Sequence, residues 1–451
     1  MTIQKEDNST RNTVIQVAEE GNCLGCGTCE AVCPKKCLRV SLNSRYGRYL
    51  PLIDQDTCNN CGKCLSVCPG REILIDQLAK EFIKSDYHRP LLGNYRELLL
   101  GYACNASIRY NSASGGLVTA LLLYALEKGL IDGALILGTD PRNPLHTIPL
   151  IARNRNDILS AMGSKYCPGA VNRGLREILD IPGRYAVAGL PCHVHALRKW
   201  QQQSRVLRER IKYVLGLFCA NMSTHFGTEY FLRNKNISPK NVTGLRYRAG
   251  GWPGVIQVTT NRGTREFKRG TTEKNRKKRR LLTSAFHYDF TVPRCLVCPD
   301  QTCELADISF ADPHLPELRQ KYSDGISWSI VRNRNVADLI SAASADNYVW
   351  VEPFPLEKAL EAQNYKYKES VGGRIAVWKR KGRHVPVFGK DFESTLEAEQ
   401  AAEMYWWSFY SHNRMLWPLI KITCIIGRKR FSNLRNRSMS IQEKIAGLWK
   451  K

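Results

Sequence analysis

Two cysteine-rich runs near the start of the chain constrain its folding more than any other feature. Each run has the spacing C-x2-C-x2-C-x3-C and is followed at once by a proline, Pro34 or Pro69. Three thiolates separated by two residues can wrap around one compact inorganic group, and the fourth, placed before proline, turns away from it. The cysteines are Cys23, Cys26, Cys29 and Cys33 in the first run and Cys58, Cys61, Cys64 and Cys68 in the second.

This doubled pattern is typical of a bacterial-type ferredoxin domain with two clusters. We expect one [4Fe-4S] cluster on Cys23, Cys26, Cys29 and Cys68, and the other on Cys58, Cys61, Cys64 and Cys33. A zinc site and a disulfide knot are the alternatives, but zinc prefers four ligands in two pairs and the total of 17 cysteines is odd. Cys37 is left over, and we interpret it as a packed or spare thiol.

The two cysteine runs are a small part of a longer chain. The 451 residues suffice for two or three domains, and the cysteine usage indicates a reducing compartment, so we expect a cytoplasmic protein. The polar start resembles no signal peptide, and no stretch reaches the length of apolar residues that a spanning helix needs. We expect a polar tail over 1–20, the ferredoxin domain over 21–75, a linker over 76–98, two further regions over 99–180 and 181–395, and an aromatic and basic tail over 396–451.

The chain carries 67 Lys and Arg against 41 Asp and Glu, a formal net charge of +26. Nucleic acid, an anionic membrane, or anionic cofactors and redox proteins would each suit such a surface, but no nucleic-acid-binding module is visible, so we expect no nucleic acid. The densest basic run, 274–280, is either a solvated loop or a docking patch for an acidic partner.

Two loops have the composition of an anion or ring site. Ser114, Gly115 and Gly116 precede an apolar stretch over 117–129 that predicts a helix, with Ser114 or Ser112 as its cap and Gly129 as its left-handed end. Glycines at a helix start let backbone N–H groups approach a phosphate. Ser164, Lys165 and Tyr166 form the second loop. An ordinary loop is the alternative in both cases.

Four cysteines outside the two runs suggest a third cluster. Cys192 and Cys219 follow two predicted strands, at 183–189 and 211–218, and Cys295 and Cys298 form a C-x2-C pair before proline. Because sites collect at the carboxyl ends of strands in α/β sheets, the four thiols can meet. Buried apolar cysteines beside a small metal clip are the alternative. Cys303 is the reserve ligand, and His193 is a candidate donor to a flavin or substrate. We also predict a short hairpin from 38–42 and 49–53, a strand over 325–332 and a turn at Gly372-Gly373.

The tail combines an aromatic run at 404–410, an apolar stretch at 416–426 and basic residues at 428–437. This composition suits a helix in a membrane interface and equally a helix packed on the protein or on a partner. Peripheral membrane contact through 400–451 is therefore one hypothesis.

Taken in order, several segments resemble the coenzyme F-420 hydrogenase/dehydrogenase beta-subunit family over residues 21 to about 335. The resemblance rests on the motifs at 114–116, 163–166, 189–192, 218–219, 251–254, 294–301 and 306–310. It implies an iron–sulfur flavoprotein that binds FAD, with Ser114, Gly115, Gly116, Ser164, Lys165 and Tyr166 as flavin contacts and the four scattered cysteines as cluster ligands. Cys303 and the 311–314 segment depart from the family pattern, which puts the acceptor in question.

We therefore predict an α+β protein, a small two-cluster ferredoxin-like domain followed by a mixed α/β flavin-binding catalytic region. It would pass electrons between clusters, FAD and a small-molecule acceptor of the coenzyme F-420 type, and dock an acidic electron-transfer protein or partner subunit. The alternatives are a non-catalytic electron-transfer subunit and a membrane-peripheral reductase acting on lipid-linked or cell-surface polysaccharide intermediates.

Overall fold

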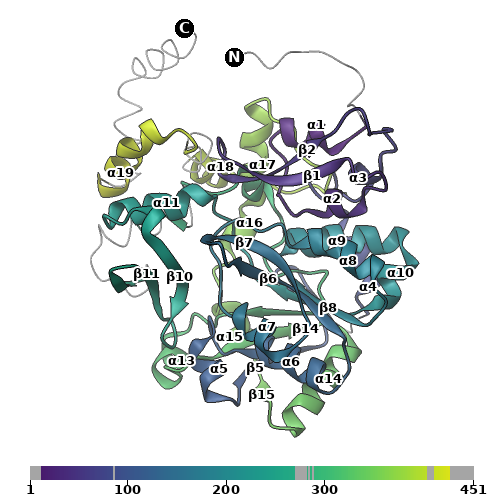
Figure 1. Ribbon diagram of the computed structural model, residues 1–451, viewed down its shortest axis with the longest axis vertical. Helices are drawn as coiled ribbons and strands as arrows, with labels where there is room; N and C mark the ends of the chain where they lie inside the picture. The colour runs from purple at the N-terminus through teal and green to yellow at the C-terminus, as the bar shows by residue number, and fades with distance from the viewer. Residues whose placement is uncertain are drawn as a thin grey trace.

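A mixed β-sheet forms the centre of the protein, and the ferredoxin-type region lies against one of its helical layers (Figure 1). The computed structural model describes residues 12–84, 87–269, 282, 285–286, 289–403 and 411–426. The basic run at 274–280 and the aromatic run at 404–410 lie outside these residues.

The sheet has eight strands, and their order is not their order in the chain. From one edge to the other they are β15 (Val349–Pro353), β5 (Glu97–Ala103), β14 (Ser327–Val331), β13 (Ile308–Ala311), β9 (Ile211–Leu217), β8 (Tyr185–Gly189), β6 (Gly133–Asp140) and β7 (Asn143–Ala152). The pairs β13/β9, β9/β8 and β8/β6 are parallel. The carboxyl ends of β8 and β9 therefore lie at one edge of the sheet, as the sequence predicted.

Alternate side chains on these strands pack into two separate hydrophobic cores, one on each face of the sheet. On β6, Ala134 and Ile136 pack with the helices α6 (Leu117–Glu127) and α14 (Arg334–Ala345), whereas Leu135 packs on the opposite face. That opposite face is covered by α8 (Leu175–Asp180), α9 (Pro191–Gln203) and α10 (Arg205–Arg210). Because successive strand residues point to opposite faces, the continuous apolar runs of β6 and β8 reflect a sheet that is buried on both sides.

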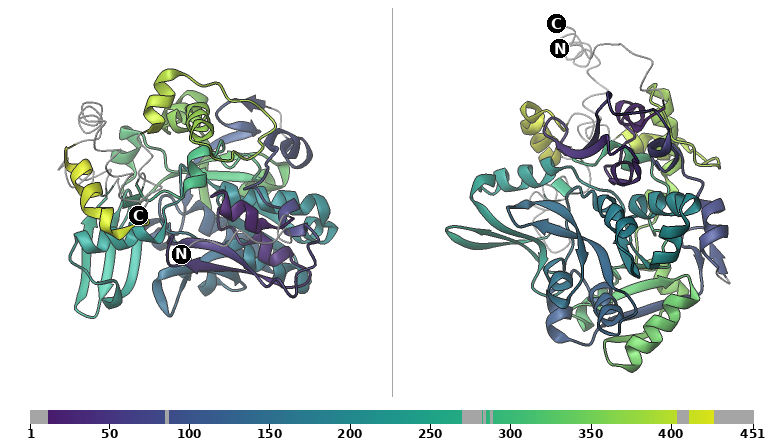
Figure 2. Two further views of the ribbon diagram at one scale, coloured as in Figure 1. Left: turned by 90° about the horizontal axis from the view of Figure 1, so that it is seen from above. Right: turned by 45° about the vertical axis from the view of Figure 1, so that its right-hand side comes forward.

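The ferredoxin-type region packs on the α8/α9 layer (Figure 2). It contains α1 (Val14–Glu19), α2 (Thr28–Val32), the hairpin β1 (Leu38–Asn43) and β2 (Arg48–Ile53), and α3 (Lys63–Ser66). The hairpin expected between the two cysteine runs is confirmed, with Val40 opposite Pro51. Val17 and Leu65 share one apolar core with Val194 and Leu197 of α9, so this region is part of the body of the protein.

A smaller sheet forms a second lobe beside the central one. Its strands are β10 (Val242–Ala249), β11 (Val255–Thr260) and β12 (Gly263–Lys268). It packs with α11 (His225–Asn234) and α19 (Trp417–Ile426) through an aromatic core that includes Phe226, Tyr230 and Phe290.

Short elements connect these parts and cover their edges. The stretch expected as a linker at 76–98 holds most of the helix α4 (Ile75–Phe82) and the small hairpin β3 (Tyr87–Arg89) and β4 (Gly93–Tyr95). The other elements are α5 (Ala106–Asn111), α7 (Arg155–Ser160), η2 (Val171–Gly174), η3 (Pro239–Asn241), η5 (Pro293–Val297), α13 (Pro316–Lys321), α15 (Leu356–Glu361), α16 (Lys366–Glu369), α17 (Val371–Arg380), α18 (Leu396–Glu403) and η7 (Arg414–Leu416).

Two local predictions were wrong. Gly372 and Gly373 lie inside α17 and not in a turn, because α18 crosses there so closely that a Cβ on Gly373 would lie 2.6 Å from the carbonyl carbon of Ala398. The cap of α6 is Gly116 in a left-handed conformation, with no side-chain hydrogen bond from Ser112 or Ser114. Among the described residues, no helix has the length and apolar character to cross a membrane.

Candidate functional site

The first predicted cysteine set surrounds a hollow of about 400 Å³ in the ferredoxin-type region. The chain brings together all four predicted ligands although Cys68 is 39 positions from Cys29, and Cys64 also lines the hollow. Burial raises the pKa of Cys29 well above its ordinary value, and the charges of Cys26, Cys23 and Cys68 raise it further. Burial likewise raises the pKa of Cys68 to about 12. Thiols so placed become thiolates when iron supplies the compensating charge.

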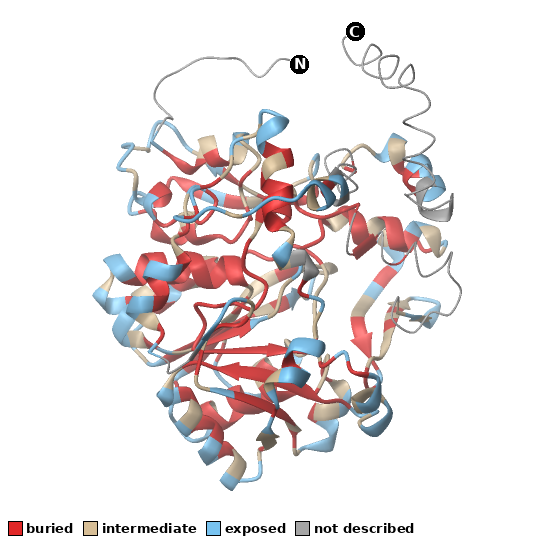
Figure 3. Ribbon diagram, turned by 180° about the vertical axis from the view of Figure 1, so that it is seen from behind, coloured by how far each residue is buried: buried red, intermediate tan, exposed pale blue. Residues whose placement is uncertain are grey.

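The second set surrounds a hollow of about 270 Å³ next to the first. Its cysteines are Cys33, Cys37, Cys58, Cys61 and Cys64, so Cys64 lines both hollows. Cys61 is exposed and lies in a largely exposed segment, 54–61, so the second hollow is the outer one. Exposed residues of the ferredoxin-type region lie along its outer edge (Figure 3). Cys37, interpreted from sequence as a spare thiol, belongs to this set. Its signal in the sequence was its place four residues after Cys33.

Left-handed glycines shape the loops around the first hollow. Gly27 has φ +90°, and a Cβ there would lie 2.7 Å from Cγ of Arg173. Gly25 has φ +68°, and its Cβ would lie 2.9 Å from the carbonyl oxygen of Tyr49. Only glycine combines this backbone conformation with so close an approach. These two glycines therefore fix the path of the loop that carries Cys23, Cys26 and Cys29 along the hollow. Within the described ranges, no set of His, Cys, Asp and Glu is arranged to hold a single metal ion.

The four scattered cysteines also meet in the fold. Cys192 lies in the first turn of α9, Cys219 follows β9, and Cys295 and Cys298 lie in and after η5. Burial raises the pKa of Cys192 well above its ordinary value, and the neighbouring thiols of Cys26 and Cys219 add to the effect. Burial also raises the pKa of Cys219, with Cys295, Cys298 and Cys303 as further causes. The third set therefore has a fifth thiol, Cys303, and it reaches the first set at Cys26.

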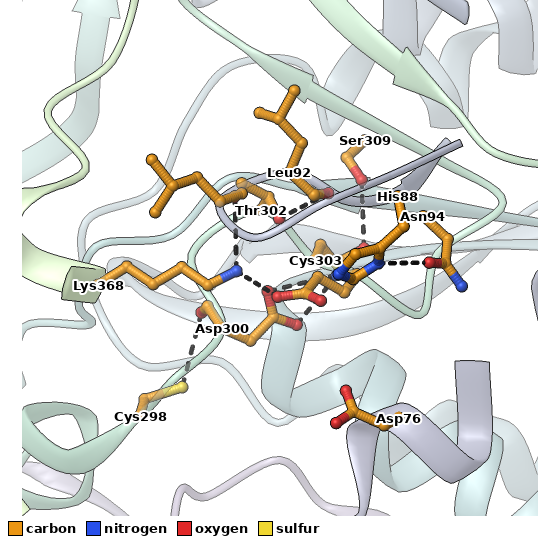
Figure 4. A network of polar contacts seen from close by, with 12 residues as sticks. Asp76, His88, Leu92, Asn94, Cys298, Asp300, Thr302, Cys303, Ser309 and Lys368 are labelled. Atoms are coloured by element: carbon orange, nitrogen blue, oxygen red, sulfur yellow. Dashed lines mark hydrogen bonds and ion pairs between the residues drawn. The ribbon is translucent and has the colours of Figure 1, made fainter. Parts of the chain in front are cut away.

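Buried polar groups lie beside Cys298 and Cys303 of the third set (Figure 4). The Asp300 carboxylate lies 2.7 Å from Nε2 of His195, and the Cys298 thiol lies 3.6 Å from the carbonyl oxygen of Asp300. Beside them Lys368 forms an ion pair with Glu304. These contacts hold the 298–304 loop against α9 and α16.

His193 has a structural role in place of the donor role suggested from sequence. Its Nδ1 accepts the Leu190 amide at 3.1 Å, so its Nε2 donates to the Gly169 carbonyl at 3.0 Å. Burial lowers the pKa of His193 to about 4. The neutral ring thus fixes the turn that presents Cys192.

The first candidate flavin loop lies against the paired strands β5 and β14, at Gly101 and Ser327. The Ser114 hydroxyl is 2.5 Å from the Ser327 hydroxyl, and the Gly115 amide donates to Ser327 Oγ at 2.7 Å. A Cβ on Gly115 would lie 2.6 Å from the Ser327 amide, which explains the small residue. Gly116, at φ +80°, begins α6.

The second candidate loop follows α7. Lys165 Nζ donates to the carbonyls of Ala161 at 2.7 Å and Gly163 at 3.2 Å, and burial lowers its pKa to about 8. The Tyr166 hydroxyl lies 3.0 Å from a guanidinium nitrogen of Arg269.

Strand β10 connects these two loops. Arg246 donates to the Asn111 carbonyl at 2.8 Å, just before the Ser114 loop. The ring of the next residue, Tyr247, lies 5.5 Å from that of Tyr166. Arg248 forms a buried ion pair with Asp312 at 2.7 Å, next to Tyr166 and Arg269. No sequence motif marks these guanidinium groups, because Arg246 and Arg248 are single residues of a strand and Arg269 directly follows β12.

Family models match most of the chain. The beta subunit N-term model of coenzyme F420 hydrogenase/dehydrogenase matches residues 98–176, and its C-terminus model matches 183–357. A 4Fe-4S dicluster domain matches residues 22–72.

Curated relatives agree with these matches. The chain is 27% identical over 270 residues to the coenzyme F420 hydrogenase subunit beta of Methanosarcina barkeri, covering 58% of this chain and 84% of the relative. It is 25% identical over 374 residues to the coenzyme F420-dependent sulfite reductase of Methanocaldococcus jannaschii, covering 80% of this chain. The chain spans about half (52%) of the length of that second relative.

A chain of the F420-reducing [NiFe] hydrogenase complex from Methanosarcina barkeri shares the fold, with a TM-score of 0.52 and 24% identity over 68% of this chain and 99% of that one. The dicluster match agrees with the two hollows, and the two beta-subunit models together span the central sheet. This chain therefore belongs to the coenzyme F420 hydrogenase/dehydrogenase beta-subunit family, a family of iron–sulfur oxidoreductases, and carries an N-terminal 4Fe-4S dicluster domain.

Proposed function

We propose that the chain passes electrons between [4Fe-4S] clusters, FAD and an organic acceptor of the coenzyme F420 type. The observation that carries this proposal is the succession of three neighbouring cysteine sets, from the exposed Cys61 inward. Cys64 lines both hollows of the ferredoxin-type region, and Cys26 neighbours Cys192 of the third set. When bound, the cubes carry single electrons and the flavin joins one-electron to two-electron chemistry.

The ligand assignment proposed for the two hollows follows the motif. Cys23, Cys26, Cys29 and Cys68 would hold the inner cluster, and Cys33, Cys58, Cys61 and Cys64 the outer one. For the third set we propose Cys192, Cys219, Cys295 and Cys298.

Arg48 supports close spacing between the inner and third sets. Its guanidinium donates to the Cys23 carbonyl at 3.0 Å, and burial lowers its pKa while the charges of Cys23 and Cys295 raise it. A buried cation between two thiolate sets offsets their negative charge and favours their reduced states.

The FAD part of the proposal rests on the loops joined by β10. Ser114, Gly115 and Gly116 stand at the start of α6; the Gly115 amide is hydrogen-bonded to Ser327, so the amides of the first turn of α6 are the ones that suit a phosphate. Ser164, Lys165 and Tyr166, with Arg248 and Arg269 beside them, add positive charge that suits an anionic cofactor or acceptor. A small-molecule acceptor would then meet the flavin on this side of the sheet.

Reduction of an acceptor by the isolated chain tests this function. The anaerobic chain would receive electrons from dithionite, and after removal of excess donor the absorbance of added coenzyme F420 would report its reduction. We expect reduction at a rate that falls at least tenfold in the Tyr166→Ala variant. A chain with clusters that reduces no acceptor would instead be an electron-transfer subunit, the role that the subunit names of its relatives suggest.

A second candidate role, attachment to an anionic membrane, has one specific observation in its favour. Met415 of η7 and Leu419 and Ile422 of α19 are 86%, 40% and 45% exposed, while Trp417 and Ile420 are buried. The sequence that follows begins Gly427-Arg428-Lys429-Arg430. Apolar side chains beside basic ones match a membrane surface with negative headgroups.

Flotation with vesicles tests that role. We expect binding to vesicles that contain phosphatidylserine, and loss of binding in the Met415→Ser/Leu419→Ser/Ile422→Ser variant. Equal flotation of the variant and the parent chain would remove α19 from this role.

A further inference from the structure

The outer hollow has one more thiol than a four-iron cube needs. Cys33, Cys58, Cys61 and Cys64 account for the motif, and Cys37 lines the same hollow. The Sγ atoms of Cys37 and Cys33 lie 3.3 Å apart, and the Cys37 side chain also contacts Cys58. Cys37 is only 8% exposed, so its thiol faces the other cysteines and not solvent.

A tight turn brings Cys37 back onto Cys33. The Lys36 amide donates to the Cys33 carbonyl at 3.2 Å, and Lys36 has φ +53°, which reverses the chain. Cys37 then immediately precedes β1, and its carbonyl accepts the Asp54 amide at 2.8 Å at the open end of the hairpin. The position of this thiol is therefore held by the hairpin as well as by the turn.

We propose that Cys37 is a reserve ligand of the outer cluster, able to take the corner of Cys33. In the exchange, the bond from iron to Cys33 breaks as Cys37 bonds to the same iron. The Cys37 proton passes to the departing Cys33 thiolate, and no electron changes hands. The distance of 3.3 Å between the two sulfurs lets one thiol replace the other with a small movement of the turn.

The inner hollow provides the matched control. Cys68 stands before Pro69 as Cys33 stands before Pro34, and the residue four positions later is Glu72 in place of a cysteine. The Glu72 side chain is 43% exposed and lies 3.8 Å from Lys199. Cys64 also lines the inner hollow but is a motif ligand of the outer cluster, so removing Cys68 leaves the inner cluster without a spare thiol.

The test compares anaerobically purified Cys33→Ser, Cys68→Ser and Cys33→Ser/Cys37→Ser with the parent chain, by iron content and by electron paramagnetic resonance of the oxidised and reduced proteins. We expect Cys33→Ser to keep the parent iron content, and Cys68→Ser and the double variant each to lose at least one iron atom per chain. A three-iron signal in the oxidised state would mark the incomplete cube.

Two results would overturn the inference. One is an iron loss in Cys33→Ser equal to that in the double variant, and the other is full iron in both. If the double variant does not fold, Cys33→Ser against Cys68→Ser still decides, because only Cys33 has a neighbouring thiol that is not itself a motif ligand of a cluster. The inference rests on the iron–sulfur part of the proposed function. A parent chain without iron would end that function, whereas a parent chain with clusters and a failed exchange would end only the role of Cys37.

Discussion

The ferredoxin-type sites and the third cysteine set contain the same side chain but are built in different ways. The first two sites come from one segment, and a repeated local spacing and left-handed glycines such as Gly27 shape their hollows. The third joins residues more than 100 positions apart, brought together by β8, β9 and η5. The first two sites can therefore be recognised from a local sequence motif. The third site forms only when the strands of the central sheet bring its cysteines together.

The largest effect is expected where the two local sites meet, at Cys64. Because Cys64 lines both hollows, Cys64→Ser should lose about four to eight iron atoms per chain, one or two cubes. Iron analysis and the visible absorbance would measure the loss. Cys104→Ser, at a half-buried cysteine outside the three sets, is the control. Full iron in Cys64→Ser would contradict the assignment of Cys64 as a cluster ligand.

The third set should respond independently of the first two. Cys295→Ser should lose about four iron atoms, one cube, and keep the remaining absorbance of the ferredoxin-type region. Cys167→Ser removes another buried cysteine and should leave the iron unchanged. Unchanged iron in Cys295→Ser would indicate that the protein holds two clusters and that the cysteines of the third set are packed thiols without iron.

The two kinds of site also differ in backbone conformation. Gly27→Ala should lower the free energy of unfolding by about 2–4 kcal/mol, because it combines a left-handed backbone with a Cβ contact of 2.7 Å to Arg173. Gly263, at φ +111° with no atom within 4 Å of a Cβ, serves as control. Its alanine variant should cost about 1 kcal/mol. Equal losses of unfolding free energy in the two alanine variants, measured by denaturant titration, would mean that the close contact between a Cβ at position 27 and Arg173 costs no stability.

The same comparison shows how much of the fold and of the candidate sites could be predicted from the sequence. The cysteine spacing predicted which thiols share each hollow, and the alternating residues at 38–53 predicted the hairpin between them. The pattern missed Cys37, because a turn at Lys36 and not a repeat places it. It also missed Arg48, Arg248 and Arg269, since their roles arise from tertiary contacts. Gly372 and Gly373 were wrongly predicted to form a turn, because glycine is also found where two helices pack closely.

The smallest expected effect concerns the contact between the ferredoxin-type hairpin and the second lobe. His225 packs edge-on against Tyr49, and burial lowers its pKa to about 3. Since the folded pKa is below that of the unfolded chain, about 6.5, the unfolded state binds the proton more tightly and stability falls as pH drops below 6.5. Between pH 6.5 and pH 5 the loss should be about 2 kcal/mol. His225→Gln should flatten this dependence in denaturant titrations, and an unchanged slope would assign it to other groups.

Iron and flavin content of the anaerobically purified parent chain test the central claim most directly. The claim is that cysteine sets on one polypeptide hold clusters that adjoin a flavin. It predicts about eight to twelve iron atoms per chain, two or three cubes, together with about one FAD released on denaturation. A protein that lacks both the metal absorbance and the yellow chromophore, even after reconstitution without oxygen, would contradict it.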